Sequence, residues 1–167
     1  MAPLKRAVLR FSQAVHASGL KPKTLRNWLD RDSIELFSER GDGWQEFSHA
    51  DIAMLALLAE LNGTGMPLPV ASGIARAVIE DTGLVKDSHV EWPANALVAI
   101  FTNKLLLIWV EDEKAFYTLI PEAEFFKKPH SARTALFVLR PAFIINNAFL
   151  SIEEEADFEW PDRPEGD

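Results

Sequence analysis

The sequence predicts an α+β protein in which helices come first and strands come second. Apolar residues recur every three or four positions as far as about Asp81, which is the period of a helix with one buried face. Beyond Pro93 they stand in short runs rich in aromatic and β-branched residues, which is typical of strands. We therefore expect a helical domain over residues 1–85, a small antiparallel β-rich domain over residues 92–152 and an acidic, disordered tail over residues 153–167.

Two short helices are expected near the N-terminus. Ser12 is a candidate N-cap for a helix over residues 12–16, and Gly19 can end that helix in the left-handed conformation. Pro22 suits the first position of a second helix. The apolar face of this second helix is expected to contain Leu25, Trp28 and Leu29. Its other face is polar and partly basic.

A β-hairpin is expected after the two helices. Residues 34–47 hold apolar positions on both sides of the turn-forming sequence 39–43. Two helices, a tight turn between them and a hairpin behind them make up a winged helix-turn-helix. The sequence thus predicts such a motif, with the hairpin as its wing.

Two longer helices follow the predicted wing. Ser48 is expected to cap the third helix, with the carboxylate of Asp51 close to the helix start, and the helix should run to about Asn62. Glycines and prolines over residues 63–69 separate it from a fourth helix over residues 68–81. The helical domain therefore has about four helices.

The second half is expected to form an antiparallel sheet. A short helix is expected over residues 121–126, and residues 143–152 fit either a final strand, which we expect, or a helix that begins at Pro141. The other expected strands are residues 97–102, 105–110, 115–120 and 134–140.

The charge is distributed unevenly along the chain. The net charge is −8, yet the first 31 residues hold seven basic residues against one acid, Asp30. The end of the chain is acidic, with Arg163 as the one basic residue after Ile152. Local fields rather than totals guide association, so the basic N-terminal region stays compatible with an anionic partner.

Several classes of function are disfavoured by composition. The chain has no cysteine, which excludes disulfides, thiolate catalysis and thiolate-bound metals. Its four histidines are far apart and lack metal-ligand spacing, so we expect no metal site and no cofactor. Neither a secretory leader nor a membrane-spanning run is evident, and we expect a cytoplasmic protein.

Three motifs resemble the DNA-binding domain of the MerR family. Residues 12–28 read SQAVHASGLKPKTLRNW, similar to the family's short helix, small residue plus glycine, and P-x-T-L-R helix start. Residues 47–51 are similar to its aromatic-Ser-x-x-Asp after the wing, and Leu61 with residues 65–68 to its L-x-x-x-G-x-x-L. The resemblance covers roughly the first half of the chain. It implies a transcriptional regulator that binds double-stranded DNA and is not an enzyme.

The resemblance and the charge together indicate which residues meet DNA. Arg26 and Asn27 are the best candidates for base contacts, since arginine pairs with guanine and asparagine with adenine. The remaining candidates are expected to meet phosphates or the minor groove. The full set of expected DNA-binding residues is Lys21, Lys23, Thr24, Arg26, Asn27, Arg31, Arg40 and Trp44.

Some residues depart from the family pattern, and these departures affect which partners we expect. Asn27 stands where the family usually has an aromatic residue, and Gln45 where it usually has an arginine, so the usual DNA-backbone contacts are weakened. The family's long dimerising helix is missing, and we expect a homodimer through the C-terminal half instead. Contact with another protein and sensing of an effector in an apolar pocket are the alternative roles of that half. The alternative is a winged-helix adaptor or antirepressor that binds a protein partner and does not read DNA.

Overall fold

The described part of the first half contains four helices, with a longer connection between the second and the third than between the others. The structure is a computed structural model, which describes residues 2–39, 45–86, 90–125, 127 and 136–156. The helices are α1 (Phe11–Ser18), α2 (Pro22–Asp30), α3 (His49–Gly63) and α4 (Leu68–Glu80). They confirm the four helices that the periodicity predicts.

Helix α1 ends at the predicted residue but begins at a different one. Gly19 closes the helix in the left-handed region, with φ 67°, and its N–H donates to the carbonyl of His16. At the start, Arg10 is the N-cap, and its N–H donates to Gln13 Oε1 over 2.8 Å. The prediction that Ser12 caps α1 is wrong, because an amide side chain at position 13 reaches back to Arg10.

Helix α3 forms the centre of the molecule. It is buried around most of its circumference, and every residue from His49 to Leu58 is less than 9% exposed. A helix that is apolar on all sides must be covered on all sides. Helices α1, α4 and α7 (Pro141–Ala156) provide that cover.

The second half contains a small sheet together with three further helices. Helix α5 (Ala94–Phe101) precedes the strands, α6 (Glu122–Phe125) lies between them, and α7 closes the fold. The strands are β1 (Lys104–Glu111), β2 (Lys114–Pro121) and β3 (Leu136–Leu139). The first two strands and α6 confirm the prediction, and β3 confirms it over the residues that are described. The α+β class is therefore confirmed.

The predictions of two strands are wrong, because both segments form helices. Residues 97–102 belong mostly to α5, where Ala94, Leu97 and Phe101 are buried at helical spacing and alanines favour the helix. Residues 143–152 belong to α7, which begins at Pro141. The buried side of α7 holds Pro141, Ile145, Ala148 and Ile152, again with a helical period. Packing against neighbouring helices overrides the β propensity of these apolar runs.

The three strands form an antiparallel sheet in the order β2-β1-β3. Ile108 lies opposite Tyr117 on one side and Phe137 on the other, and these three side chains share the face that packs against the helical core. Leu107 and its partners point to the opposite, outer face, none of whose residues belongs to that core. The sheet therefore has an inner apolar face and an outer apolar face.

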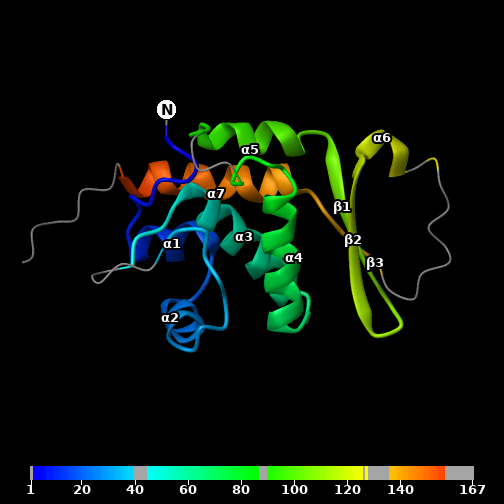
Figure 1. Cartoon of the computed structure of the whole chain (residues 1–167), viewed down its shortest axis with the longest axis horizontal. Coiled ribbons are helices and arrows are strands. Elements are labelled where there is room, and N and C mark those ends of the chain that lie inside the picture. The colour runs from blue at the N-terminus through cyan, green and yellow to red at the C-terminus, as the bar shows by residue number, and fades with distance from the viewer. Residues whose placement is uncertain (1, 40–44, 87–89, 126, 128–135, 157–167) are drawn as a thin grey trace, which may run out of the picture.

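The helices and the sheet share one hydrophobic core. It includes Leu25 and Leu58 from the first half together with Leu97, Ile108 and Ile145 from the second. In Figure 1, α5 and α7 run along one side, α2 lies on the opposite side, and the sheet stands at one end. The division into domains at residues 85–92 stays a prediction.

The acidic C-terminal segment begins inside a helix. Helix α7 continues to Ala156, so residues 153–156 are helical and their predicted disorder is wrong. Residues 157–167 lie outside the described part of the chain. Helix α7 also does not project from the fold, since it packs along α1, α3 and α5.

Candidate nucleic-acid interface

Helix α2 presents the predicted DNA-binding residues on one exposed surface. Thr24 is half-buried, and the others that are described are exposed. They are Lys21, Lys23, Arg26, Asn27 and Arg31. Lys21 is the N-cap and Pro22 the first helical residue, so Lys21, Lys23 and Thr24 surround the positive end of the helix dipole. This end of α2 is suited to an anionic partner.

The opposite side of α2 anchors the helix to the core. Leu25 is completely buried, and Trp28 and Leu29 are half-buried against the same core. Full burial of a leucine side chain stabilises a fold by about 1.5–3 kcal/mol. Trp28 is thus a packing residue, as its apolar spacing predicts. A firmly anchored helix can present its outer side chains in a fixed orientation.

A tight turn leads from α2 toward the predicted wing. The N–H of Arg31 donates to the carbonyl of Asn27, and that of Ser33 to Trp28. Asp32 occupies the left-handed region with φ 47°, a conformation that aspartate tolerates better than most residues. The turn sends the chain back toward α3 and α4.

Asp51 joins the base of the wing to the start of α3. One carboxylate oxygen, Oδ2, accepts from the N–H and the hydroxyl of Ser48 over 2.8 and 2.7 Å, while Ser48 Oγ accepts from the N–H of Asp51. The other oxygen, Oδ1, accepts from the N–H groups of Phe37 and Ser38 over 2.6 and 3.3 Å. The predicted capping signal is confirmed, and the same carboxylate also holds the segment before the wing.

Arg76 on α4 holds the same segment from the other side. Its Nη1 donates to the carbonyls of Glu35 and Leu36 over 2.9 and 3.2 Å, and its guanidinium lies 4.6 Å from the centre of the Phe37 ring. The carboxylate of Glu80 lies 2.8 Å from Nε. No local motif around Arg76 indicates this role, since its partners are about forty residues away along the chain.

Only the two flanks of the predicted wing are described. Residues 40–44 lie outside the described part of the chain, and Arg40 and Trp44 with them. On the flanks, Ser38 Oγ donates to the carbonyl of Glu46 over 3.2 Å, and Phe47 pairs with Leu9 as an isolated bridge. The two flanks approach each other, while the hairpin stays a prediction.

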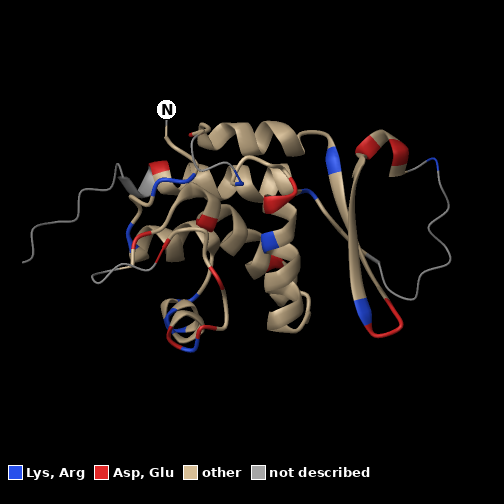
Figure 2. Cartoon of the chain, viewed as in Figure 1, with Lys and Arg blue, Asp and Glu red and all other residues tan. Residues whose placement is uncertain are grey.

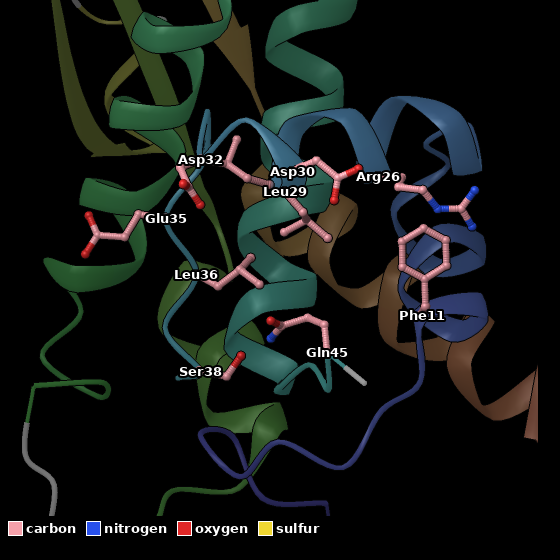
Figure 3. A pocket seen from close by; sticks show the side chains of 10 residues that line it. Phe11, Arg26, Leu29, Asp30, Asp32, Glu35, Leu36, Ser38 and Gln45 are labelled. Atoms are coloured by element: carbon pink, nitrogen blue, oxygen red, sulfur yellow. The ribbon is translucent and has the colours of Figure 1, made fainter. Parts of the chain in front are cut away.

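Arg26 lies at one end of a cleft between α2 and the base of the wing. Its guanidinium carbon is 5.4 Å from the centre of the Phe11 ring. The cleft has a volume of about 580 Å³ and is shown in Figure 3, where Leu29 and Leu36 lie between Arg26 at one end and Glu35 at the other. Phe11, which the sequence analysis did not single out, thus positions Arg26.

Both signs of charge meet around α2. Figure 2 shows basic and acidic segments together on α2 and the turn behind it, whereas α5 has neither. Asp30, Asp32 and Glu35 line the cleft beyond the C-terminal half of the helix. A polyanion is therefore favoured at the N-terminal half of α2 and repelled farther along.

The described residues contain neither a metal-binding cluster nor a membrane-spanning helix. No group of three or more histidine, aspartate or glutamate side chains lies close enough there to hold a metal ion. No helix in the described ranges is long and apolar enough to cross a membrane.

Comparison with known proteins identifies the first half. Residues 9–78 match the family model described as MerR HTH family regulatory protein, which is less than half of the chain. The match begins just before α1 and ends within α4, so it covers α1, α2, α3 and the segment predicted to form the wing. It confirms the resemblance that the three motifs indicate. No curated protein matches the chain.

Proposed function

We propose that the protein is a transcriptional regulator that reads a specific double-stranded DNA sequence with α2, because residues 9–78 match the MerR HTH regulatory family. The observation that carries this proposal is the exposed polar surface of α2 on a helix anchored through Leu25. Arg26 and Asn27 contact base edges in the major groove. Lys21, Lys23, Thr24 and Arg31 contact phosphates, and Arg40 and Trp44 act from the wing.

The first test is selection of genomic DNA fragments by the purified protein, repeated with Arg26→Ala. Loss of a bidentate arginine contact should weaken the selected site by about 1–3 kcal/mol and relax specificity at one base pair. Lys114→Ala removes an exposed positive charge at the start of β2 and should leave binding unchanged. Equal enrichment by wild type and Arg26→Ala would refute the assignment of α2 as the reading helix.

Phosphate contacts are tested separately by salt. Each phosphate contact contributes about 0.9 to the slope of log affinity against log salt concentration. Lys23→Ala, which removes one contact, should therefore reduce the size of that slope by about 0.9. The variant should weaken specific and random DNA alike, because phosphates carry no sequence. A slope near zero in the wild type would refute DNA binding.

A second candidate function is suggested by the acidic end of the cleft. Asp32 and Glu35 lie beside the apolar side chains of Leu29, Ile34 and Leu36, a combination that suits a basic segment of a protein partner. Such an adaptor or antirepressor would bind its partner without selecting DNA. The reverse charge change, Glu35→Lys, should weaken partner binding and should strengthen binding to DNA.

We further propose a homodimer through the C-terminal half. Among the described residues, most exposed large apolar side chains lie there, including Phe116 and Val138 on the outer face of the sheet. Trp109 stacks on Phe116 with ring centres 5.8 Å apart and widens this apolar face. A two-fold pair of helix-turn-helix domains would read two half-sites.

The dimer is tested by light scattering of the full chain after size-exclusion chromatography. Phe116→Glu places a charge on the outer sheet face and should convert dimer to monomer. Phe143→Glu is the matched control, since Phe143 is 65% exposed on α7, outside the sheet. A dimer that survives Phe116→Glu and is lost with Phe143→Glu would place the interface on α7 instead.

A further inference from the structure

A second cavity lies on the side of the molecule opposite α2. Its volume is about 760 Å³, and its walls come from the N-terminal segment, α1, α3, α5 and α7. Figure 1 shows α5 and α7 side by side along this edge of the fold. Such a volume is within the range of small-molecule sites, and its walls are mostly apolar, with Val8, Val98 and Leu150 among them.

His49 is the buried polar group in the wall of this cavity. Its side chain is 7% exposed, at the first position of α3. Burial lowers the pKa of His49, while a hydrogen bond to the backbone of Pro3 and the charge of Glu153 oppose that shift in part. The imidazole is therefore neutral at neutral pH, so one ring nitrogen is protonated and the other is an unprotonated acceptor.

One ring nitrogen of His49 lacks a partner. Nδ1 is covered and forms no hydrogen bond within the described part of the chain. In a neutral ring that donates from its other nitrogen, Nδ1 is a bare acceptor. Buried acceptors are almost always paired, so this one indicates a missing donor. Phe149 forms a T-shaped contact with the His49 ring, with ring centres 5.4 Å apart, and lines the same cavity.

We propose that this cavity is an effector site for an uncharged, largely apolar molecule with a hydroxyl or N–H group, and that His49 Nδ1 accepts a hydrogen bond from that group. The apolar walls receive the body of the ligand. Asn95 and Asn146 also line the cavity, from α5 and α7, and provide further polar contacts. Glu153 in the wall disfavours anions, and transfer of a cation into an apolar cavity is unfavourable.

The cavity also touches the helix that precedes the reading helix. Gln13 lines it and, through Oε1, accepts from the N–H of Arg10 at the start of α1. Leu9, another wall residue, pairs with Phe47 at the base of the wing. A ligand that shifts these residues changes how α1 and the wing base are placed relative to α2. This coupling to DNA rests on the proposed function, whereas ligand binding does not.

The binding test uses 4-propylphenol as probe and its methyl ether as the matched compound without a donor. The full chain should bind the phenol about fivefold more tightly in calorimetry, the value of one net hydrogen bond. Nitrogen NMR of His49 should show Nδ1 shifting as it accepts a hydrogen bond from the phenol and not from the ether. Equal affinity for the two compounds, or no binding of either, would overturn the proposal.

Substitutions in and outside the cavity test where 4-propylphenol binds. Ala99 is exposed in the wall of the cavity on α5, so Ala99→Trp should block the cavity without disturbing the core and abolish phenol binding. Ala123→Trp, on exposed α6, is the control and should bind as wild type does. His49→Phe should bind phenol and ether equally. Phenol binding unaffected by Ala99→Trp would place the ligand elsewhere and refute this site.

The coupling between the cavity and DNA binding is tested by measuring the affinity for DNA with and without saturating 4-propylphenol. A change of several fold that Ala99→Trp abolishes would support coupling. Phenol binding that leaves DNA affinity unchanged would overturn the coupling. If no DNA site is found at all, the proposed function fails, while the calorimetry and NMR still decide the ligand site.

Discussion

His49 shows how one side chain takes its protonation state from its surroundings. It begins α3, where a charged imidazolium would meet the positive end of a helix dipole. Around it lie Phe149, the backbone of Pro3 and, farther away, the carboxylate of Glu153. Burial outweighs the two stabilising contacts, so the pKa of His49 is lowered from its usual value of 6.5.

The lowered pKa predicts acid sensitivity. In the unfolded chain His49 gains a proton as pH falls below about 6.5, while in the folded protein it resists protonation to a lower pH. Its contribution to stability is therefore present above about pH 6.5 and lost as pH falls through the folded pKa. Urea unfolding at about pH 7.5 and about pH 5.5 should show this loss in wild type and less of it in His49→Phe. The control variant His16→Asn, at an exposed histidine, should lose as much stability as wild type. If His49→Phe loses as much stability between the two pH values as wild type does, His49 is not the cause of the acid sensitivity.

The sequence predicts that Arg26 is an exposed basic residue on α2, but it does not predict the direction in which its side chain points. A basic residue on the outer face of a short helix is read directly from the spacing of Leu25 and Leu29. Its position over the ring of Phe11 arises because α1 and α2 pack together. A guanidinium held on an aromatic ring has fewer orientations to lose when it binds, which favours contact with a base edge.

At the scale of elements, the base of the wing is a joint between α2, α3 and α4. Residues 35–38 form no regular hydrogen-bonded strand, and their backbone groups are satisfied by side chains instead. Asp51 accepts from two of their N–H groups, and Arg76 donates to two of their carbonyls. Two helices of the core thus set the direction in which the chain leaves toward the wing.

This joint predicts different effects for two neighbouring substitutions. Asp51→Ala removes the acceptors for Ser48, Phe37 and Ser38, and should lower the free energy of unfolding by about 1.5–3 kcal/mol or more. Ser48→Ala removes the helix cap and the hydroxyl bond to Asp51 Oδ2, at a cost of about 1 kcal/mol, but leaves the bonds from Phe37 and Ser38 to Asp51 in place. Hydrogen exchange should show the Phe37 amide losing protection in Asp51→Ala alone. Equal protection in both variants would mean that Asp51 does not hold the wing base.

At the scale of the whole molecule, the two halves are joined by backbone as well as by core. The N–H of Leu4 donates to the carbonyl of Trp92, and the carbonyl of Leu4 accepts from Ala50 at the start of α3. On the other side, the hydroxyl of Tyr117 on β2 donates to Asp81 Oδ2 over 2.7 Å, just after α4. The N-terminal segment and this side-chain bond connect the second half to both ends of the helical region.

The bond from the sheet to α4 can be measured because Tyr117 is the sole tyrosine of the chain. Burial, with the hydrogen bond to Asp81 and nearby negative charge, raises the pKa of Tyr117 to about 12. Since the folded pKa exceeds the unfolded value near 10, this stabilisation is present below about pH 10 and is lost as pH rises through about 12. Ultraviolet titration should find tyrosinate forming near 12 in the native chain and near 10 in urea.

A variant tests the same bond at neutral pH. Tyr117→Phe should lower the free energy of unfolding by about 0.5–1.5 kcal/mol, the net value of one hydrogen bond. Asp81→Asn, which keeps an acceptor for the hydroxyl and removes the charge, should bring the titration of Tyr117 closer to 10. An unchanged titration in that variant would mean that burial by itself accounts for the shift.

The sequence by itself determined the local features of this protein. Glycine, proline and cap residues mark the end of α1, the start of α2 and the start of α3, and motifs over residues 12–68 are sufficient to indicate the MerR-type domain. Strands β1 and β2 follow from short apolar runs separated by turn residues. These features depend on neighbours a few positions away, which is why spacing and composition reveal them.

Tertiary structure alone decided the rest. Residues 97–101 and 143–152 are helical because α5 and α7 bury one side against each other and α7 also packs against α1 and α3. An apolar run without that context fits a strand equally well. The roles of Arg76 and Phe11, the second set of bonds to Asp51 and the cavity at His49 all join segments that are remote in sequence. Such contacts arise only when the chain is packed, because no local pattern encodes which distant side chain will lie beside another.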